Sequence, residues 1–148
     1  VELSHKYKNM SVLAGYELHL SNKLKDGSDV WLNNPRVTRE ASGTSGMTAA
    51  MNGSINFSTN DGWIREFEEI SPESVYTLPI IDHTLPHYDQ DKMDLANLYK
   101  ILENEILPLY YGDNDAWFRK VHKSMSDVVP FFDSDRMASD YYTKLYNI

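Results

Sequence analysis

Apolar residues recur with two different periods along the chain, and these periods predict an ordered series of helices and strands. Within 16–25, Leu20 and Leu24 recur at helical spacing, and Gly27 follows where a left-handed C-cap would lie. The short apolar run 29–32 is closed by an Asn-Asn-Pro sequence, which is typical of a buried strand that ends in a loop. The pattern therefore predicts a helix followed by a strand.

The same two kinds of element follow again. Residues 45–51 predict a short helix stopped by Gly53, and residues 54–58 alternate as a strand does before the turn residues 60–62. Helix, strand, loop, helix and strand in this order are typical of an α/β fold, which binds ligands at the carboxyl ends of its strands. The loop after residue 32 follows such an end.

The second half of the chain has a different pattern. Residues 71–90 contain three prolines around the single strand-like run 74–81, and they predict a connecting segment. From Lys92 onward, apolar residues at three- and four-residue spacing predict a helix that Pro108 should kink or end; they are Leu95, Leu98, Leu102, Ile106 and Leu109. Two more helices are predicted at 115–129 and 134–146, the last with Asp133 or Ser134 as N-cap.

Composition narrows the class of protein. The 148 residues suffice for one ordinary domain, and 41% of them are hydrophobic. The absence of cysteine excludes disulfides and thiol chemistry and fits a reducing compartment, so we expect a cytoplasmic location. A net charge of -8 disfavours nucleic acid as a partner, because the Lys and Arg residues are scattered singly. No apolar stretch has the length of a membrane span, so no membrane partner is expected. The chain begins at Val1 in a stretch typical of the middle of a fold, and we expect a fragment.

The loop 41–46, with the sequence ASGTSG, has no side chain larger than threonine and follows Glu40 directly. Its glycines let the backbone approach a ligand closely, and its hydroxyl and N–H groups suit an oxygen-rich ligand. If a helix begins near Thr44, its free N–H groups favour an anion such as phosphate, and Glu40 can accept hydrogen bonds from sugar hydroxyls or bind a cation. A capping box and tight turn without a ligand explains the same residues, and both interpretations stay open on this pattern.

A longer match adds to this pattern. Residues 29–67, DVWLNNPRVTREASGTSGMTAAMNGSINFSTNDGWIREF, resemble almost residue for residue the cofactor-site segment of α-glucan phosphorylases, the glycogen and starch phosphorylase family, especially its shorter bacterial branch. The resemblance continues in LYKILENEILPLYY, FRKVHKSMSDVVPFF and RMASDYYTKLY, which are similar to the C-terminal helices of that family. It covers most of the chain and is weakest over 67–90.

The resemblance implies an α/β fold in two parts. Residues 1–66 would form part of the second Rossmann-like lobe of a two-lobed (GT-B type) glycosyltransferase, 67–90 a connecting segment and 91–148 a C-terminal helical region. The family transfers a terminal glucose of an α-1,4-glucan to orthophosphate and releases glucose 1-phosphate. The implied partners are an α-glucan, phosphate or glucose 1-phosphate, and the upstream lobe of the same protein. The fragment alone should be inactive, and a homo-oligomer is left open.

The resemblance also implies roles for residues of the loop. Glu40, the expected catalytic residue, would hold hydroxyls of the transferred glucose, and Ser42 and Gly43 would contact the same sugar. Thr44 would lie near the phosphate of pyridoxal phosphate, the cofactor of the family, whose phosphate group exchanges a proton with the substrate phosphate. No metal ion is expected.

Thr48 departs from the family pattern, which has a lysine here that forms a Schiff base with pyridoxal phosphate. Threonine has no amine, so this bond cannot form at position 48. Three explanations are open: the cofactor binds noncovalently through its phosphate, the protein is a nucleotide-sugar glucosyltransferase that works without it, or the protein is a non-catalytic glucan-binding relative. The retained residues Glu40, Ser42, Gly43 and Thr44 favour a working sugar site.

Other lysine, histidine and acidic residues have types or spacings that also occur in functional sites. Lys23 and Lys25 are expected to be solvated helix residues rather than the missing amine. His83 and His87 have a metal-ligand spacing for a helix, but a proline lies between them and no metal is assigned. The acidic run at 66–69 is expected to be a solvated face at the edge of a loop.

Among the aromatic residues, Trp63 is the best candidate for stacking on a sugar ring, because it follows the turn residues Asp61 and Gly62. Aromatic residues at helical or strand spacing more often fill cores and interfaces, and this alternative also stays open for Trp63 and for the tyrosine pairs at 110–111 and 141–142.

Overall fold

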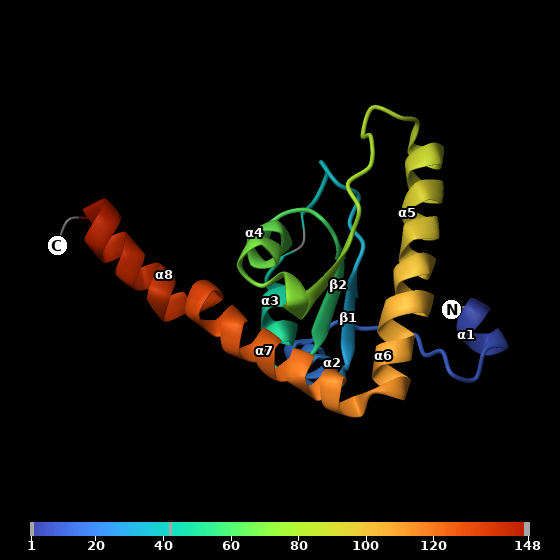
Figure 1. Cartoon of the computed structure of the whole chain (residues 1–148), viewed down its shortest axis with the longest axis horizontal. Coiled ribbons are helices and arrows are strands. Elements are labelled where there is room, and N and C mark those ends of the chain that lie inside the picture. The colour runs from blue at the N-terminus through green and yellow to red at the C-terminus, as the bar shows by residue number, and fades with distance from the viewer. Residues whose placement is uncertain (1, 42, 147–148) are drawn as a thin grey trace.

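The computed structural model describes residues 2–41 and 43–146. Three short parallel strands form a sheet in the order β1-β2-β3, with β1 at Val30–Asn33, β2 at Ile55–Thr59 and β3 at Val75–Leu78. Helix α3 (Thr44–Met51) connects β1 to β2, and helix α4 (Trp63–Ile70) connects β2 to β3 through a 3₁₀ turn at Pro72–Ser74 (Figure 1). The expected α/β class is confirmed.

The central strand β2 is buried along its whole length and separates two layers of the core. Ile55 and Phe57 pack with Ile101, Ile106 and Trp117 of the later helices. The opposite layer is formed by α3, α4 and a later helix, with the cluster Ala50, Trp63, Ile64, Phe67, Val75 and Val128. The two faces of the sheet therefore pack against two different layers, as expected for a sheet covered on both faces.

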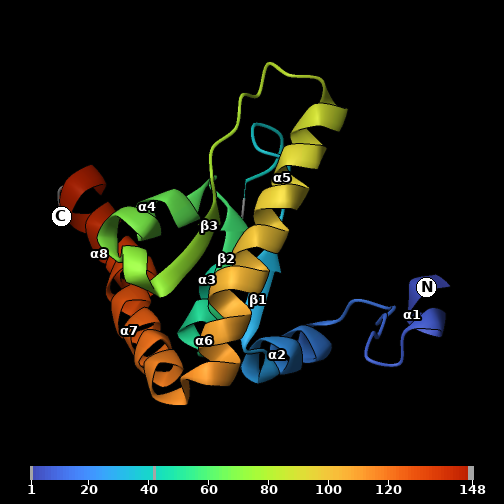
Figure 2. The same cartoon turned by 45° about the vertical axis from the view of Figure 1, so that its right-hand side comes forward.

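A continuous helical rod covers one face of the sheet (Figure 2). It consists of α5 (His87–Ile101), a π-helical turn (Leu102–Ile106) and α6 (Leu107–Gly112). The rod begins at His87, five residues before the expected start, because the polar sequence after Pro86 gives no apolar period to mark its first turn. Pro108 lies in the first turn of α6, directly after the π turn, and the helix continues to Gly112.

The remaining helices lie outside this unit. Helix α1 spans Glu2–Lys6 and α2 spans Leu18–Gly27. The two predicted C-terminal helices are confirmed as α7 (Asn114–Phe132) and α8 (Ser134–Asp140), the latter followed by a π-helical turn at Tyr141–Tyr146. Helix α7 packs against α3, whereas α8 extends away from the body (Figure 1).

Three local expectations were wrong. Strand β1 is an edge strand of the described sheet rather than a buried one, and 49% of Leu32 is exposed. Gly27 is the last residue of α2 in an ordinary helical conformation, and the extended residue after it ends the helix without a left-handed cap. Helix α4 forms where a loop edge was expected, because its glutamates alternate with buried positions such as Ile64 and Phe67. The division at residues 66 and 90 stays a prediction, although β3 lies within the expected connecting segment.

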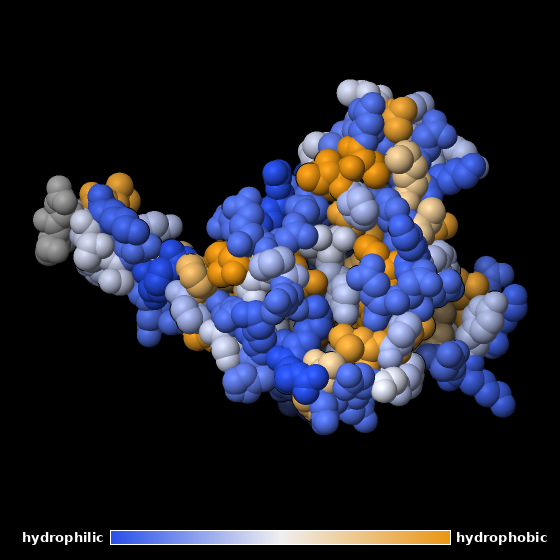
Figure 3. Space-filling model, viewed as in Figure 1, coloured by the Kyte–Doolittle hydropathy of each residue, from blue (hydrophilic) through white to orange (hydrophobic). Residues whose placement is uncertain are grey.

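Apolar side chains reach the surface over α5 and the segment before it (Figure 3), where Ile80 is 64% and Leu95 54% exposed. Among the described residues, no helix combines the length and the apolar character that crossing a membrane requires.

Replacing Gly46 by Ala should destabilise the chain. The added Cβ would lie 2.8 Å from Asn56 Oδ1 and 3.1 Å from both Asn33 Nδ2 and Trp63 Cζ2, so buried groups must shift. We expect a loss of about 1 to 3 kcal/mol in the free energy of unfolding, measured by urea denaturation. Gly27→Ala is the matched control, because no atom lies within 4 Å of its added Cβ. Equal denaturation midpoints for the two variants would show that α3 can move away from the sheet.

Candidate functional site

The chain between Asn33, at the carboxyl end of β1, and Thr44, the first residue of α3, contains Glu40, and the last three residues of the small-residue stretch 41–46 form the first turn of α3 (Figures 1 and 2). Gly43 is the N-cap of α3 in an extended conformation, with φ -111° and ψ -165°, and has no side chain to cap the helix. The first N–H groups of a helix have no partners within the helix, so those of Thr44 and Ser45 can face an anion, whereas the Gly46 N–H donates to the Gly43 carbonyl oxygen at 3.2 Å. The helix start at Thr44 thus brings donor groups to the ligand-binding edge of a parallel sheet.

A buried amide holds this helix start against the sheet. Asn56 on β2 is 0% exposed, and its Nδ2 donates to the carbonyl oxygen of Gly46 at 3.0 Å. Its Oδ1 accepts from Asn33 Nδ2 on β1 at 3.2 Å. One side chain therefore connects two strands to the first turn of α3 and fixes where that turn lies.

The predicted site residues are divided between the loop and the helix. Glu40, Gly43 and Thr44 are exposed, whereas Ser42 lies outside the described residues. Thr48 is half-buried one turn after Thr44, and its Oγ1 donates to the carbonyl oxygen of Thr44 at 3.0 Å. Thr44 and Thr48 therefore share one face of α3. Glu40 precedes them in the loop before α3.

A hollow of about 390 Å³ lies between α2 and the start of α3. Its walls include Thr44 and Ser45 together with Tyr16, Lys25 and Trp31. Lys25 was expected to be a solvated helix residue, yet it is half-buried and lines the same hollow as Thr44. Only the packing of α2 against α3 reveals this position, because helical spacing alone does not say which neighbour a residue meets.

A second hollow, of about 410 Å³, lies at the carboxyl end of the sheet against α5. Asn34 and Arg36 from the loop after β1 face Asp91 and Asp94 of α5 across an apolar floor that includes Leu78. Burial and then the neighbouring Asp91 carboxylate raise the pKa of Asp94, against smaller opposite effects of His83 and Arg36. The Asn34 and Arg36 side chains can donate hydrogen bonds to a hydroxyl-rich ligand, and the Asp91 and Asp94 carboxylates can accept them.

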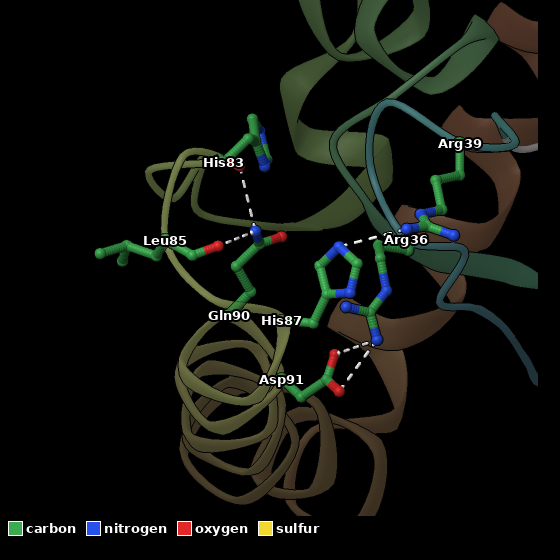
Figure 4. A network of polar contacts seen from close by, with 7 residues as sticks. All are labelled: Arg36, Arg39, His83, Leu85, His87, Gln90 and Asp91. Atoms are coloured by element: carbon green, nitrogen blue, oxygen red, sulfur yellow. Dashed lines mark hydrogen bonds and ion pairs between the residues drawn. The ribbon is translucent and has the colours of Figure 1, made fainter.

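Polar contacts join the loop to the first turns of α5 (Figure 4). Arg36 Nη2 lies 2.7 Å from Asp91 Oδ1, and Arg39 Nη2 lies 3.2 Å from His87 Nε2. Gln90 is buried, and its Nε2 donates to two carbonyl oxygens of the segment before α5. His87 thus contacts an arginine. Over the described residues, no group of three or more His, Cys, Asp or Glu is placed to hold a metal ion.

Two further residues have roles that differ from the expectation. Trp63 is 5% exposed, with its ring stacked on Phe67 at 5.5 Å and edge-on to Phe132 at 5.1 Å, so it fills the core and does not offer a face to a sugar. Glu68 is half-buried and accepts from Asn60 Nδ2 at 2.6 Å and from the hydroxyl of Thr77, so it is not simply a solvated residue.

The structure defines an α/β unit with a loop at the carboxyl edge of its sheet. Several known proteins have sequences similar to this chain. The chain is 42% identical to an uncharacterized protein of Methanocaldococcus jannaschii over 99% of its length, and 37% identical to the maltodextrin phosphorylase of Thermococcus litoralis over 96%. It is 36% identical to the glycogen phosphorylase of Aquifex aeolicus over 89%. The chain spans only 27%, 17% and 19% of these three relatives. No family model matches it. The phosphorylase names support a relationship to that family.

Removing the Asn56 amide should destabilise the contact between α3 and the sheet. In Asn56→Ala, the Gly46 carbonyl and the Asn33 amide lose their partner in the core, which costs about 1 to 3 kcal/mol of unfolding free energy. Asn33→Ala should cost less, because the Asn56–Gly46 bond remains. Urea denaturation of both single variants and the double variant measures the coupling between them. Strictly additive losses would mean that the two amides act independently.

Proposed function

We propose that the chain is part of an α-glucan phosphorylase-like glycosyltransferase of glycogen or starch metabolism. The observation that carries the proposal is the similarity to two proteins named phosphorylases along 96% and 89% of the chain, with the Glu40 loop at the carboxyl edge of a parallel sheet. In this proposal the chain belongs to the second lobe of a GT-B type fold. An upstream lobe of a cytoplasmic protein closes the cleft, and the substrates are an α-glucan and phosphate or glucose 1-phosphate.

The roles proposed for the loop residues come from the resemblance to the phosphorylases and are compatible with the chemistry of the described residues. Glu40 is exposed and can accept hydrogen bonds from two neighbouring hydroxyls of a glucosyl unit. The backbone of Gly43 carries no side chain that would keep a sugar away, and Ser42 is proposed to contact the same sugar. The N–H groups that begin at Thr44 favour a phosphate group close to it. The loop would therefore hold the sugar on one side and a phosphate on the other.

Pyridoxal phosphate fits this site only in part. The free helix start at Thr44 suits its phosphate, and the hollow beside Thr44 offers the aromatic walls Tyr16 and Trp31. Thr48 has no amine to bond the cofactor, and its hydroxyl is already bonded to the Thr44 carbonyl. The residues therefore do not fit a covalently held cofactor.

The residue at position 48 favours two alternative functions. A nucleotide-sugar glucosyltransferase also needs a sugar-binding carboxylate and donors for phosphate, and it needs no amine. A glucan-binding relative without catalysis needs the sugar contacts alone. Both candidates keep Glu40 in contact with sugar, and they differ from the phosphorylase in whether orthophosphate takes part in a reaction.

Glu40→Gln in the full-length protein should lower turnover by about 100-fold or more, because the carboxylate charge that holds the sugar hydroxyls is lost. The stability should change by no more than about 0.5 kcal/mol, because Glu40 is exposed. The assay is orthophosphate-dependent release of glucose 1-phosphate from a maltodextrin, with and without added pyridoxal phosphate. Glu66→Gln, an exposed carboxylate on α4, is the control. Full activity of Glu40→Gln would refute the sugar-site assignment. No release by the unaltered protein in either condition would favour the nucleotide-sugar glucosyltransferase or the glucan-binding relative.

Thr48→Lys should create a covalent anchor for pyridoxal phosphate without loss of stability. Position 48 lies on the same face of α3 as Thr44, and lysine is a better helix former than threonine by about 0.5 kcal/mol. Intact-mass measurement after borohydride reduction should show one added pyridoxyl phosphate group. Lys100→Gln in the same background controls for labelling of exposed lysines. If the adduct maps to other lysines and not to position 48, the phosphate end of the pocket is not formed.

A further inference from the structure

Two side chains of α5 contact the loop that carries Glu40. Arg36 Nη2 lies 2.7 and 2.9 Å from the two carboxylate oxygens of Asp91, and Arg39 Nη2 lies 3.2 Å from His87 Nε2. His87 and Asp91 are four residues apart, so they project from one face of α5. Figure 4 shows both arginines of the loop reaching toward this face.

The loop between these contacts is strained. Thr38 has a φ of 73°, which is unfavourable for a β-branched residue, and its N–H points to Asp61 Oδ2 at 3.4 Å. A backbone conformation of this kind persists only where surrounding contacts hold it. The Arg39–His87 bond comes directly before Glu40 in the sequence, so it fixes the backbone from which the Glu40 side chain projects.

The Arg39–His87 bond requires a neutral imidazole. A guanidinium group can only donate, so Nε2 of His87 must be the acceptor and the ring proton must be on Nδ1. Protonation of the ring turns Nε2 into a second donor and places two positive charges against each other. The contact therefore depends on the protonation state of the His87 ring.

We propose that His87 and Asp91 are positioning residues for Glu40, and that the Arg39–His87 contact makes the order of the loop depend on a neutral His87. The proposal rests on the proposed function only for the role of Glu40. The order of the loop can be measured without any substrate.

Other charged groups of the elements that meet here also bear on a pH response; they are Arg36 and Arg39 of the loop, Asp61 after β2, Asp82 and His83 before α5, and Asp91 and Asp94 on α5. Hydrogen bonds from Thr84 lower the pKa of Asp82, so this carboxylate keeps its charge while an imidazole titrates. Burial and Asp91 raise the pKa of Asp94, which brings its titration closer to that range. Asp94 therefore needs a control of its own.

Hydrogen exchange of the full chain tests the proposal. The Thr38 and Arg39 amides are bonded to Asp61 and to the Arg36 carbonyl, so their exchange reports on the loop. After correction for the intrinsic rate, we expect exchange about three- to tenfold faster at about pH 5.5 than at about pH 7.5. His87→Gln keeps a neutral acceptor for Arg39 and should show the same corrected rate at both pH values. Asp91→Asn should exchange faster at both.

Control variants separate His87 from its neighbours. Asp94→Asn and His83→Gln should keep the pH response of the unaltered chain. The proposal is overturned if His87→Gln responds to pH as the unaltered chain does, or if the unaltered chain shows no response. In the full-length protein, His87→Gln should also flatten the acidic side of the turnover profile. A failure of Glu40→Gln to lower turnover would reject the proposed function and leave the exchange result unaffected.

Discussion

The buried amide of Asn56 is the interaction on which the geometry of the loop depends. An amide without partners in a core costs several kcal/mol, so β1, β2 and the first turn of α3 must stay where Asn33 and the Gly46 carbonyl can reach it. The same close approach leaves no space for a side chain at Gly46. The glycine-rich sequence is therefore explained partly by packing at Gly46, whereas the exposed residues Gly43 and Thr44 can face a ligand.

This division means that the residue at position 48 can vary without a change in the packing of α3 against the sheet. Thr48 bonds to the Thr44 carbonyl oxygen within its own helix and takes no part in the Asn56 network. The donors at the helix start come from the backbone, and they are present whatever residue occupies position 48. In the proposed function, binding of a phosphate group and covalent anchoring of a cofactor would thus be separable.

The elements that could be predicted from the sequence were those whose signals are local. Helix α3 and strand β2 follow from small residues, alternation and Gly53, which has a φ of 93°. Helix α4 was missed although its apolar residues Trp63, Ile64 and Phe67 recur at helical spacing, because its acidic residues were interpreted as the edge of a loop. The burial of Trp63 stayed open at that point, since it depends in part on Phe132, far along the chain. The Arg39–His87 contact joins residues 48 positions apart and has no local signal.

The two restraints on the loop differ in their chemistry. The Asn56 amide does not titrate and is shielded from water, so the helix start at Thr44 is held equally at any pH at which the chain is folded. The contacts of Arg36 and Arg39 are exposed and depend on charge, so they are weaker and respond to salt and pH. The start of α3 is therefore held rigidly, whereas the Glu40 side of the loop is adjustable. Under the proposed function, such a site would change its hold on the sugar without losing its hold on a phosphate group.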